Sequence, residues 1–266
     1  MLRQNDHNHT MEQWQDQGII LSSRKHGESG AIVSLLTRTR GRYVGYVRGA
    51  QGTKMRGVLE IGNSVDVAWQ SRVAENMGTY ALELSANAGV HLLHDPLRLS
   101  ALQAVCALCD AAMPEREAHE GLFDGTLALF EAMKNEDIWA AAYVMWEIAF
   151  LRELGFSLDL SKCAAGSGDD DLIYVSPKTG RAVSRSAGAP YKEKLLSLPA
   201  FLTPRGGDID DIAIDQALQL TGFFFEHWAF THHSRGIPDA RLRFAERFAK
   251  TIKPADIADS KDLKRA

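Results

Sequence analysis

The sequence predicts an α+β protein in which a small β-barrel is followed by an all-helical domain. Short β-rich runs separated by glycine fill residues 14–90, which is the first observation behind this prediction. Apolar residues at helical spacing begin after His94, which is the second. The 266 residues are enough for one large domain or two smaller ones.

Five strand-like runs lie within the predicted barrel, residues 14–90. Their ranges are 17–23, 31–37, 42–48, 64–70 and 79–85. A glycine-rich basic loop is expected at 49–57, between the third strand and the fourth. Five strands with a loop-rich middle are the element count of an OB-type barrel, although other small barrels share that count. Residues 1–13 are expected to form a disordered leader.

Positive charge is concentrated in residues 18–56. This stretch carries eight Lys or Arg against one acid, Glu28, whereas the whole chain has a formal net charge of −4. A clustered positive field is typical of proteins that bind the phosphates of nucleic acids. We therefore expect these cations to contact DNA: Arg24, Lys25, Arg38, Arg40, Arg42, Arg48, Lys54 and Arg56.

Tyr43 and Tyr46 lie among these cations and alternate with apolar neighbours. Aromatic side chains beside a basic surface can stack on unpaired bases. The same alternation is equally compatible with packing in the barrel core, so both roles remain open.

The helical domain is predicted to comprise residues 91–156 and 190–250. Asp95 is a suitable N-cap, and Pro96 a suitable first residue, for a helix over 97–113. Two more helices are expected in the first part. They cover 117–133 and 138–154, the latter capped by Asp137 and ended by Gly155.

In the second part, helical character is predicted over 191–198, from Asp208 or Asp210 to about His233, and over 240–250. Residues 235–266 carry nine basic and five acidic residues. We interpret this region as a solvated, frayed tail, with a secondary DNA contact as the weaker alternative. Residues 251–266 are expected to be flexible.

The first helices are acidic, in contrast to the barrel. Residues 91–160 hold four basic and twelve acidic residues. An acidic helical block beside a basic barrel favours one face for nucleic acid and another for protein partners.

Residues 157–189 are poor in apolar side chains and contain one strand candidate, 172–175. A segment of this kind is usually functional or held by a covalent or metal staple. The triplet Asp169–Asp171 lacks the ligand spacing of a calcium loop, so we favour a solvated acidic turn over a cation site.

The three cysteines, Cys106, Cys109 and Cys163, fit a reducing compartment. Cys106 and Cys109 fall within a helical apolar pattern and are expected to be buried hydrophobes rather than metal ligands. His227, His232 and His233 are expected to be surface or helix-terminal groups, because no further metal ligand can be placed beside them.

Several function classes are not supported by the sequence. It has no P-loop, no GxSxG and no HExxH motif, so we expect no enzymatic activity and no cofactor. It has no apolar run of about 18 residues, so no membrane span is expected. The N-terminus lacks the apolar core of a signal peptide, which predicts a cytoplasmic protein. A non-catalytic adaptor with a solvated basic barrel face remains the alternative to a DNA-binding protein.

Five short motifs occur in order along the chain: GIIL at 18–21, RKHGES at 24–29, GRY at 41–43, YVRGA at 46–50 and LRELGF at 151–156. On these motifs the sequence resembles the RecO family of DNA repair and recombination mediators, in its alphaproteobacterial form. The resemblance covers about residues 12–250.

The resemblance implies an N-terminal OB fold, a helical domain discontinuous in sequence, and a zinc-ribbon-like insertion at 157–189. Many family members hold this insertion with two CxxC pairs. Here Cys163 stands alone, Gly166 occupies the position three residues on, and 174–180 contains no cysteine. We therefore predict an insertion without structural zinc, ordered by the packing of residues 172–175.

The resemblance also implies a function. Family members bind single- and double-stranded DNA, anneal complementary strands, interact with RecR and help to load RecA, which implies association with the nucleoid. They also bind the acidic C-terminal tail of single-stranded DNA-binding protein. That tail would need a hydrophobic pocket with a cation at its rim, and Arg98, Arg116 and Arg152 are equal candidates.

Overall fold

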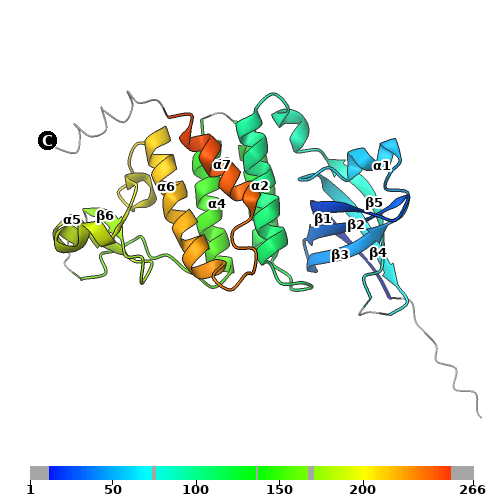
Figure 1. The fold of residues 1–266 in the computed structure, drawn as a ribbon, viewed down its shortest axis with the longest axis horizontal. Coiled ribbons are helices and arrows are strands. Elements are labelled where there is room, and N and C mark those ends of the chain that lie inside the picture. Colours follow the sequence, from blue (N-terminus) through cyan, green and yellow to red (C-terminus); the bar gives the residue numbers. More distant parts are fainter. Residues whose placement is uncertain (1–11, 74–75, 136, 167–170, 253–266) are drawn as a thin grey trace, which may run out of the picture. The chain divides into compact units, whose positions relative to one another are not determined.

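The computed structural model describes residues 12–73, 76–135, 137–166 and 171–252. The predicted leader therefore lies outside the described residues except for its last two positions, and the predicted tail except for its first two. The chain divides into two compact units (Figure 1). One holds the described residues up to His94 together with Val105–Asp124, and the other holds Asp95–Ala104 together with those from Gly125 onward.

The first unit contains a closed five-stranded barrel. Its strands are β1 (Glu12–His26), β2 (Gly30–Thr37), β3 (Gly41–Val47), β4 (Ser64–Ser71) and β5 (Thr79–Ala86), in the order β1-β2-β3-β5-β4. The long β1 pairs with β2 through residues 18–26 and with β4 through residues 12–19. A short parallel contact between β3 and β5 closes the barrel. The predicted OB-type fold is confirmed.

The barrel core follows the alternation of the strands. On β3, Tyr43 and Val47 point inward, whereas Arg42 and Tyr46 point outward. Gly45 allows the ring of Tyr80 to lie directly on the β3 backbone, where any Cβ would collide with it. Trp14, Tyr43 and Trp69 complete an aromatic cluster at this level of the core.

One expectation for the barrel was wrong. Residues 49–57 are not entirely loop, because a short helix, α1 (Thr53–Val58), follows the turn after β3. Val58 and the adjacent Leu59 are each 7% exposed, and Met55 packs on the same core. This burial stabilises a helical turn that local sequence signals did not indicate.

The longer helices are α2 (Pro96–Ala112), α3 (Glu120–Ala132), α4 (Trp139–Glu153), α6 (Asp211–Phe224) and α7 (Asp239–Ala249). In the second unit, α4 packs against α6 and α6 against α7, side by side in Figure 1. Among the described residues, no helix is long and apolar enough to cross a membrane.

Several helix boundaries confirm the predicted signals. Asp95 Oδ1 accepts hydrogen bonds from the backbone N–H groups of Leu97 and Arg98, at 3.0 and 2.9 Å, and so caps α2. Asp210 caps α6 in the same way, through Ala213. Gly155 has a φ of 90° after α4, which is the left-handed conformation that ends many helices.

Other boundaries differ from those predicted. The N-cap position of α4 is occupied by Ile138, and Asp137 does not cap the helix. Helix α3 begins at Glu120 rather than 117, after an irregular stretch in which Arg116 has a φ of 63°. The helix expected to run to His233 ends at Phe224 and continues as one π-helical turn, Phe225–Ala229.

The basic helix at the C-terminal end was also misjudged. Helix α7 is present as predicted, but it is not part of a frayed tail. Arg241, Phe244 and Phe248 on one face of it are buried. The stretch 191–198, expected to be helical, forms instead a 3₁₀ turn (Ala189–Lys194) and a two-residue strand, β8 (Leu196–Ser197).

The insertion contributes two strands to a three-stranded antiparallel sheet in the order β7-β6-β8, and the third strand, β8, follows the insertion in the chain. Strand β6 (Leu172–Val175) confirms the predicted strand, and β7 (Ala182–Ser184) leads into the short helix α5 (Arg185–Gly188). The thiol of Cys163 is buried and accepts a hydrogen bond from the N–H of Ser184 at 3.3 Å. The likeness to a zinc ribbon and the lack of zinc both remain predictions.

Packing against the helices orders this insertion. Gly180 has a φ of 66°, and a Cβ there would lie 2.9 Å from both Leu158 and the ring of Trp228, on the π-helical turn. Of the predicted acidic turn, Asp169 and Asp170 lie outside the described residues, and Asp171 pairs with Arg185 at 2.6 Å.

Candidate nucleic-acid interface

The eight cations predicted to contact DNA fall into two groups on the barrel. In the β2–β3 pair, Thr37 lies opposite Gly41 at one end and Ala31 opposite Val47 at the other. The six residue steps from Gly41 to Val47 separate these ends by about 20 Å. Three of the cations lie at or just beyond the first end: Arg38, Arg40 and Arg42.

The other five cations define what we call the basic end: Arg24, Lys25, Arg48, Lys54 and Arg56. Ala31 of β2 lies opposite Lys25 of β1 on one side and opposite Val47 of β3 on the other. Lys25 and Arg48, the residue after Val47, are therefore about 10 Å apart across β2. The N–H of Gln51 bonds to the carbonyl of Ser29 at 3.3 Å and ties the start of α1 to the same end.

Side chains of the basic end are available to a ligand. All five are exposed, and none forms an ion pair or a side-chain hydrogen bond with another described residue. Unpaired charges on neighbouring elements sum to a positive field that attracts phosphate. This set of five is the best candidate for a nucleic-acid interface in the first unit.

The first group is occupied by protein partners. Arg42 is only 17% exposed, and its Nε donates to the carbonyl of Met113 at 2.8 Å while Nη2 meets Glu115 at 3.0 Å. Arg38 pairs with Asp124 at 2.8 Å. Arg40 is exposed, with its guanidinium 6.0 Å from the ring of Trp14. A phosphate would have to displace these carboxylates in order to bind Arg38 or Arg42.

The two tyrosines have different environments. Tyr43 is 7% exposed and packs edge-on against Trp14 and Trp69, with ring centroids 5.1 and 5.4 Å away. The prediction that it could stack on bases is therefore wrong, and the packing alternative is confirmed. Tyr46 is half-buried, and its ring lies over Gly30, where no Cβ could fit.

Sequence reasoning missed a pocket of about 760 Å³ on the barrel. It lies between β1, β4 and β5, with the end of β3 and α1 at its side. Gln13, Gln15 and Gln70 line it together with Trp14 and Arg48. The alternation QWQ at 13–15 was the signal for these outward amides, but only the closed barrel shows that they converge.

The three arginines considered for the partner tail also differ. Arg98 is bound to Asp95 at 2.5 Å and to the carbonyl of Met133 at 3.0 Å. Arg116 belongs to the first unit, with its guanidinium 4.9 Å from the ring of Tyr43. Arg152, in the last turn of α4, is exposed and forms no ion pair within the described part of the chain.

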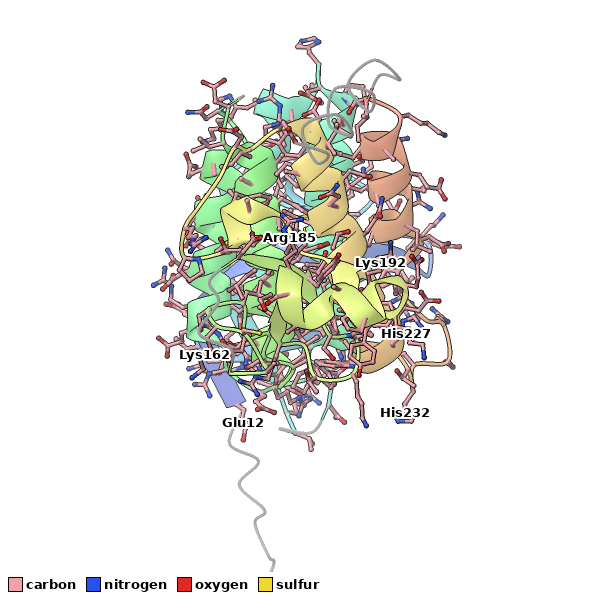
Figure 2. All side chains as sticks on the ribbon, turned by 90° about the vertical axis from the view of Figure 1, so that its left-hand side faces the viewer. Glu12, Lys162, Arg185, Lys192, His227 and His232 are labelled. Carbon is pink, nitrogen blue, oxygen red and sulfur yellow. The ribbon has the colours of Figure 1, made fainter. Side chains whose placement is uncertain are left out.

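Three cations of the second unit lie at its surface. Lys162, Arg185 and Lys192 are exposed on the side that carries the insertion (Figure 2). His227 stacks on Phe223 at 4.0 Å, and its Nδ1 lies 2.9 Å from the Phe223 carbonyl. Within the described ranges, no group of three or more His, Cys, Asp or Glu could hold a metal ion.

The buried thiols of α2 do not form a reactive pair. Cys106 and Cys109 are both fully buried, as predicted. Burial raises the pKa of each thiol, so that neither is a thiolate at neutral pH.

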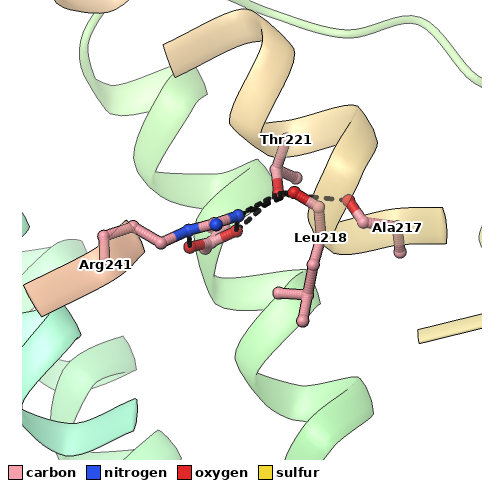
Figure 3. Close-up of polar contacts among 5 residues, drawn as sticks. Ala217, Leu218, Thr221 and Arg241 are labelled. Atoms are coloured by element: carbon pink, nitrogen blue, oxygen red, sulfur yellow. Dashed lines mark hydrogen bonds and ion pairs between the residues drawn. The ribbon is translucent and has the colours of Figure 1, made fainter. Parts of the chain in front are cut away.

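One buried polar network joins α4, α6 and α7 (Figure 3). Arg241 Nε donates to Glu147 Oε1 at 2.6 Å, and Arg241 Nη2 donates to Glu147 Oε2 at 3.0 Å and to the Leu218 carbonyl at 2.7 Å. The Thr221 hydroxyl donates to Glu147 Oε2 at 2.5 Å. Because Glu147 is 0% and Arg241 3% exposed, the network is structural and is not open to a ligand.

Two family models match the chain. The family model "Recombination protein O N terminal" matches residues 11–86, and "Recombination protein O C terminal" matches residues 93–235. Several curated proteins named "DNA repair protein RecO" are similar over nearly their whole length. That of Rhodospirillum centenum is 51% identical over 241 residues, covering 90% of this chain and 95% of the relative. That of Rhodospirillum rubrum is 44% identical over 246 residues, covering 90% and 98%, and that of Caulobacter vibrioides is 44% identical over 241, covering 91% and 99%.

Proposed function

The chain belongs to the RecO family of DNA repair and recombination proteins, and from this premise we propose that it is a non-catalytic mediator. It binds single- and double-stranded DNA, anneals complementary strands, and helps RecR to load the RecA recombinase. Its DNA substrate implies that it acts at the nucleoid. The broader role of the chain, in DNA repair and recombination, follows from its membership of the family.

The observation that supports DNA binding most directly is the basic end. Five exposed cations on β1, α1 and the end of β3 have no carboxylate partner among the described residues. When such cations meet phosphates they release condensed counterions, which gives sequence-independent binding that weakens with salt. Binding of this kind needs no nucleotide and no metal.

For the tail of single-stranded DNA-binding protein, the exposed charge of Arg152 makes it the best of the three candidates. Arg98 and Arg116 are already engaged within the protein. An acidic tail needs a cation that it does not have to take from another carboxylate.

The test is binding of a fluorescent single-stranded oligonucleotide across a salt series, without nucleotide or metal. We expect the logarithm of affinity to fall linearly with the logarithm of salt concentration, by about 0.7 for each phosphate neutralised. Replacing Arg24, Lys25 and Arg56 together with Gln should lower the slope by about 2 and the affinity by about tenfold or more. Annealing of complementary strands should slow in parallel.

The matched control replaces three exposed cations of the second unit that have no ion pair with described residues, Lys162, Lys178 and Lys194, with Gln. This variant loses the same net charge and should keep the wild-type slope. If both triple variants bound DNA like the wild type, the basic end would be only a solvated face. The protein would then be better described as an adaptor.

A further inference from the structure

Helix α4 is apolar on its exposed face as well as on its buried one. From Trp139 to Leu151 it contains one charged residue, Glu147, and that residue is buried. A helix that is hydrophobic all round is typical of a protein interior. Yet Met145 is 53% exposed, and Ile138, directly before the helix, is 51% exposed. One side of α4 is therefore uncovered where its composition predicts burial.

The uncovered side has the spacing of a single helical face. Residues three and four apart along a helix lie on the same face. We call the set on this side the α4 outer face: Ile138, Ala141, Ala142, Met145, Ile148, Ala149 and Arg152. The exposed face of α7 is charged instead, with Arg243, Glu246, Arg247 and Lys250. Contact with water alone does not account for six apolar residues on the α4 outer face.

The α4 outer face is complementary to itself. Met145 lies at its centre, with Ile138 seven residues before it and Arg152 seven residues after it. Seven residues make about two helical turns, so all three side chains point the same way. When two α4 helices cross antiparallel at Met145, Ala141 of each helix meets Ala149 of the other. These small side chains allow the two helix axes to approach within about 8 Å.

The charges at the two ends of the face match in the same arrangement. Arg152 is exposed in the last turn of α4, and Asp137 is exposed directly before Ile138. Neither charge forms an ion pair with another described residue. Antiparallel crossing at Met145 brings Arg152 of each copy opposite Ile138 of the other, within reach of its Asp137. Two ion pairs, one at each end, therefore favour the antiparallel orientation over the parallel one.

We propose that the α4 outer face is a dimer interface, in which a second copy of this chain pairs its α4 antiparallel about a two-fold axis at Met145. Every contact then occurs twice, as in other two-fold interfaces. One pair of helices buries less surface than a standard interface, so the dimer should be weak. The interface belongs to the second unit and does not depend on DNA binding.

The experiment is sedimentation equilibrium of the full chain, without DNA, over a range of protein concentrations. We expect a monomer–dimer equilibrium with a dissociation constant of roughly 10–100 µM. Met145→Glu places two like charges together on the two-fold axis and should weaken the dimer by about tenfold or more. The matched control is Leu242→Glu, which adds the same charge at an exposed apolar position of α7. It should leave the dissociation constant unchanged.

Charge reversal tests the orientation of the two helices. Arg152→Asp should weaken the dimer, because it brings two carboxylates together at each end of the interface. Adding Asp137→Arg to the same chain restores an attractive pair at each end, so the double variant should dimerise like the wild type. Circular dichroism of each variant checks that its helices are folded. A double variant that dimerises as weakly as Arg152→Asp would overturn the antiparallel arrangement.

Two further results would overturn the interface. One is a wild-type chain that stays monomeric up to about 1 mM, ten times the expected range. The other is an equal dissociation constant for the wild type and Met145→Glu, which would show that the dimer forms elsewhere on the chain. The competing occupant is the acidic tail of single-stranded DNA-binding protein, since Arg152 belongs to the same face. A monomeric chain that loses binding of a synthetic acidic tail peptide in Met145→Glu, but keeps it in Leu242→Glu, would assign the face to that partner instead.

A dimer also affects annealing, and this effect rests on the DNA-binding function proposed above. Two copies carry two basic ends, so one particle can hold two complementary strands. Above the dissociation constant of the dimer, Met145→Glu should slow annealing several-fold and leave the affinity for single strands unchanged. Unchanged annealing would overturn this role of the dimer. A wild-type dimer that does not bind DNA would overturn the proposed function and leave the interface intact.

Discussion

Arg241 shows that a positively charged residue on a basic helix can be buried rather than exposed. It lies on the basic helix α7, yet its guanidinium is buried and hydrogen-bonded to Glu147, Leu218 and Thr221. Burial alone would lower the pKa of Arg241, but the attraction of the Glu147 carboxylate outweighs it and the pKa is raised. Arg241 therefore remains charged and joins α7 to α4 and α6.

We expect Arg241→Ala to destabilise the second unit by about 3–5 kcal/mol, because it leaves the Glu147 carboxylate buried without a partner. Urea denaturation followed by circular dichroism would measure the loss. The control is Arg243→Ala, on the same helix but exposed and without an ion pair to a described residue. It should cost about 0.5 kcal/mol or less.

The comparison can be sharpened by the double replacement Glu147→Leu/Arg241→Met, which removes both charges together. Because no uncompensated charge remains, this variant should recover much of the lost stability. Equal stability of Arg241→Ala and Arg243→Ala would show that the network does not hold α7 in place.

The arginines at the two ends of β3 differ: Arg42 at its start binds other parts of the protein, whereas Arg48 just past its end is exposed. At its start, Arg42 bonds to Met113 and Glu115, and the N–H of Arg116 donates to the Arg42 carbonyl at 2.8 Å. These contacts fasten residues 113–117 to the barrel within the first unit. Just past its other end, Arg48 is exposed and unpaired with any described carboxylate.

Replacing these two arginines singly should therefore give opposite results. Arg48→Ala should lower the salt slope of single-stranded DNA binding by roughly one phosphate contact, about 0.7, with little change in the thermal midpoint. Arg42→Ala should keep the slope and lower the thermal midpoint, since it removes the ion pair with Glu115 and leaves the Met113 carbonyl without its donor. A larger loss of slope in Arg42→Ala than in Arg48→Ala would contradict this division of the strand.

At the scale of the whole molecule, the insertion is ordered by packing against its own unit. Trp228 lies against Gly180, and β6 brings Leu172 and Val175 into buried positions. Cys163 contributes a hydrogen bond with Ser184. Among the described residues, it does not belong to any group of three or more side chains that could hold a metal ion. We expect burial and backbone pairing to supply the stability that a metal supplies in a zinc ribbon.

We therefore expect purified protein to contain well below one equivalent of zinc when measured by inductively coupled plasma mass spectrometry. A chelator should leave its thermal unfolding unchanged, because no folding free energy depends on a metal. Cys163→Ala serves as the matched variant and should lower stability modestly without altering metal content. About one equivalent of zinc, or a fall in the thermal midpoint with chelator, would refute the prediction.

The sequence by itself determined the types of most elements. Alternation marked the five strands, and caps such as Asp95 and Asp210 marked two helix starts, because both signals depend on residues that are neighbours in the chain. It also placed the cations on the barrel. It could not place α1 or β8, since these short elements are stabilised by surfaces that distant residues provide.

Only the tertiary structure decided which cations are available. Arg42 and Arg48 are the same residue type, six positions apart and at opposite ends of one strand. The carboxylate that pairs with Arg42 lies 73 residues later in the chain, at Glu115, and no local pattern connects the two. The same holds for Glu147 and Arg241, 94 residues apart, and for the amides that meet in the pocket. Local patterns specify the elements because their energetics are short-range, whereas pairing and cavities arise from contacts that exist only once the chain has folded.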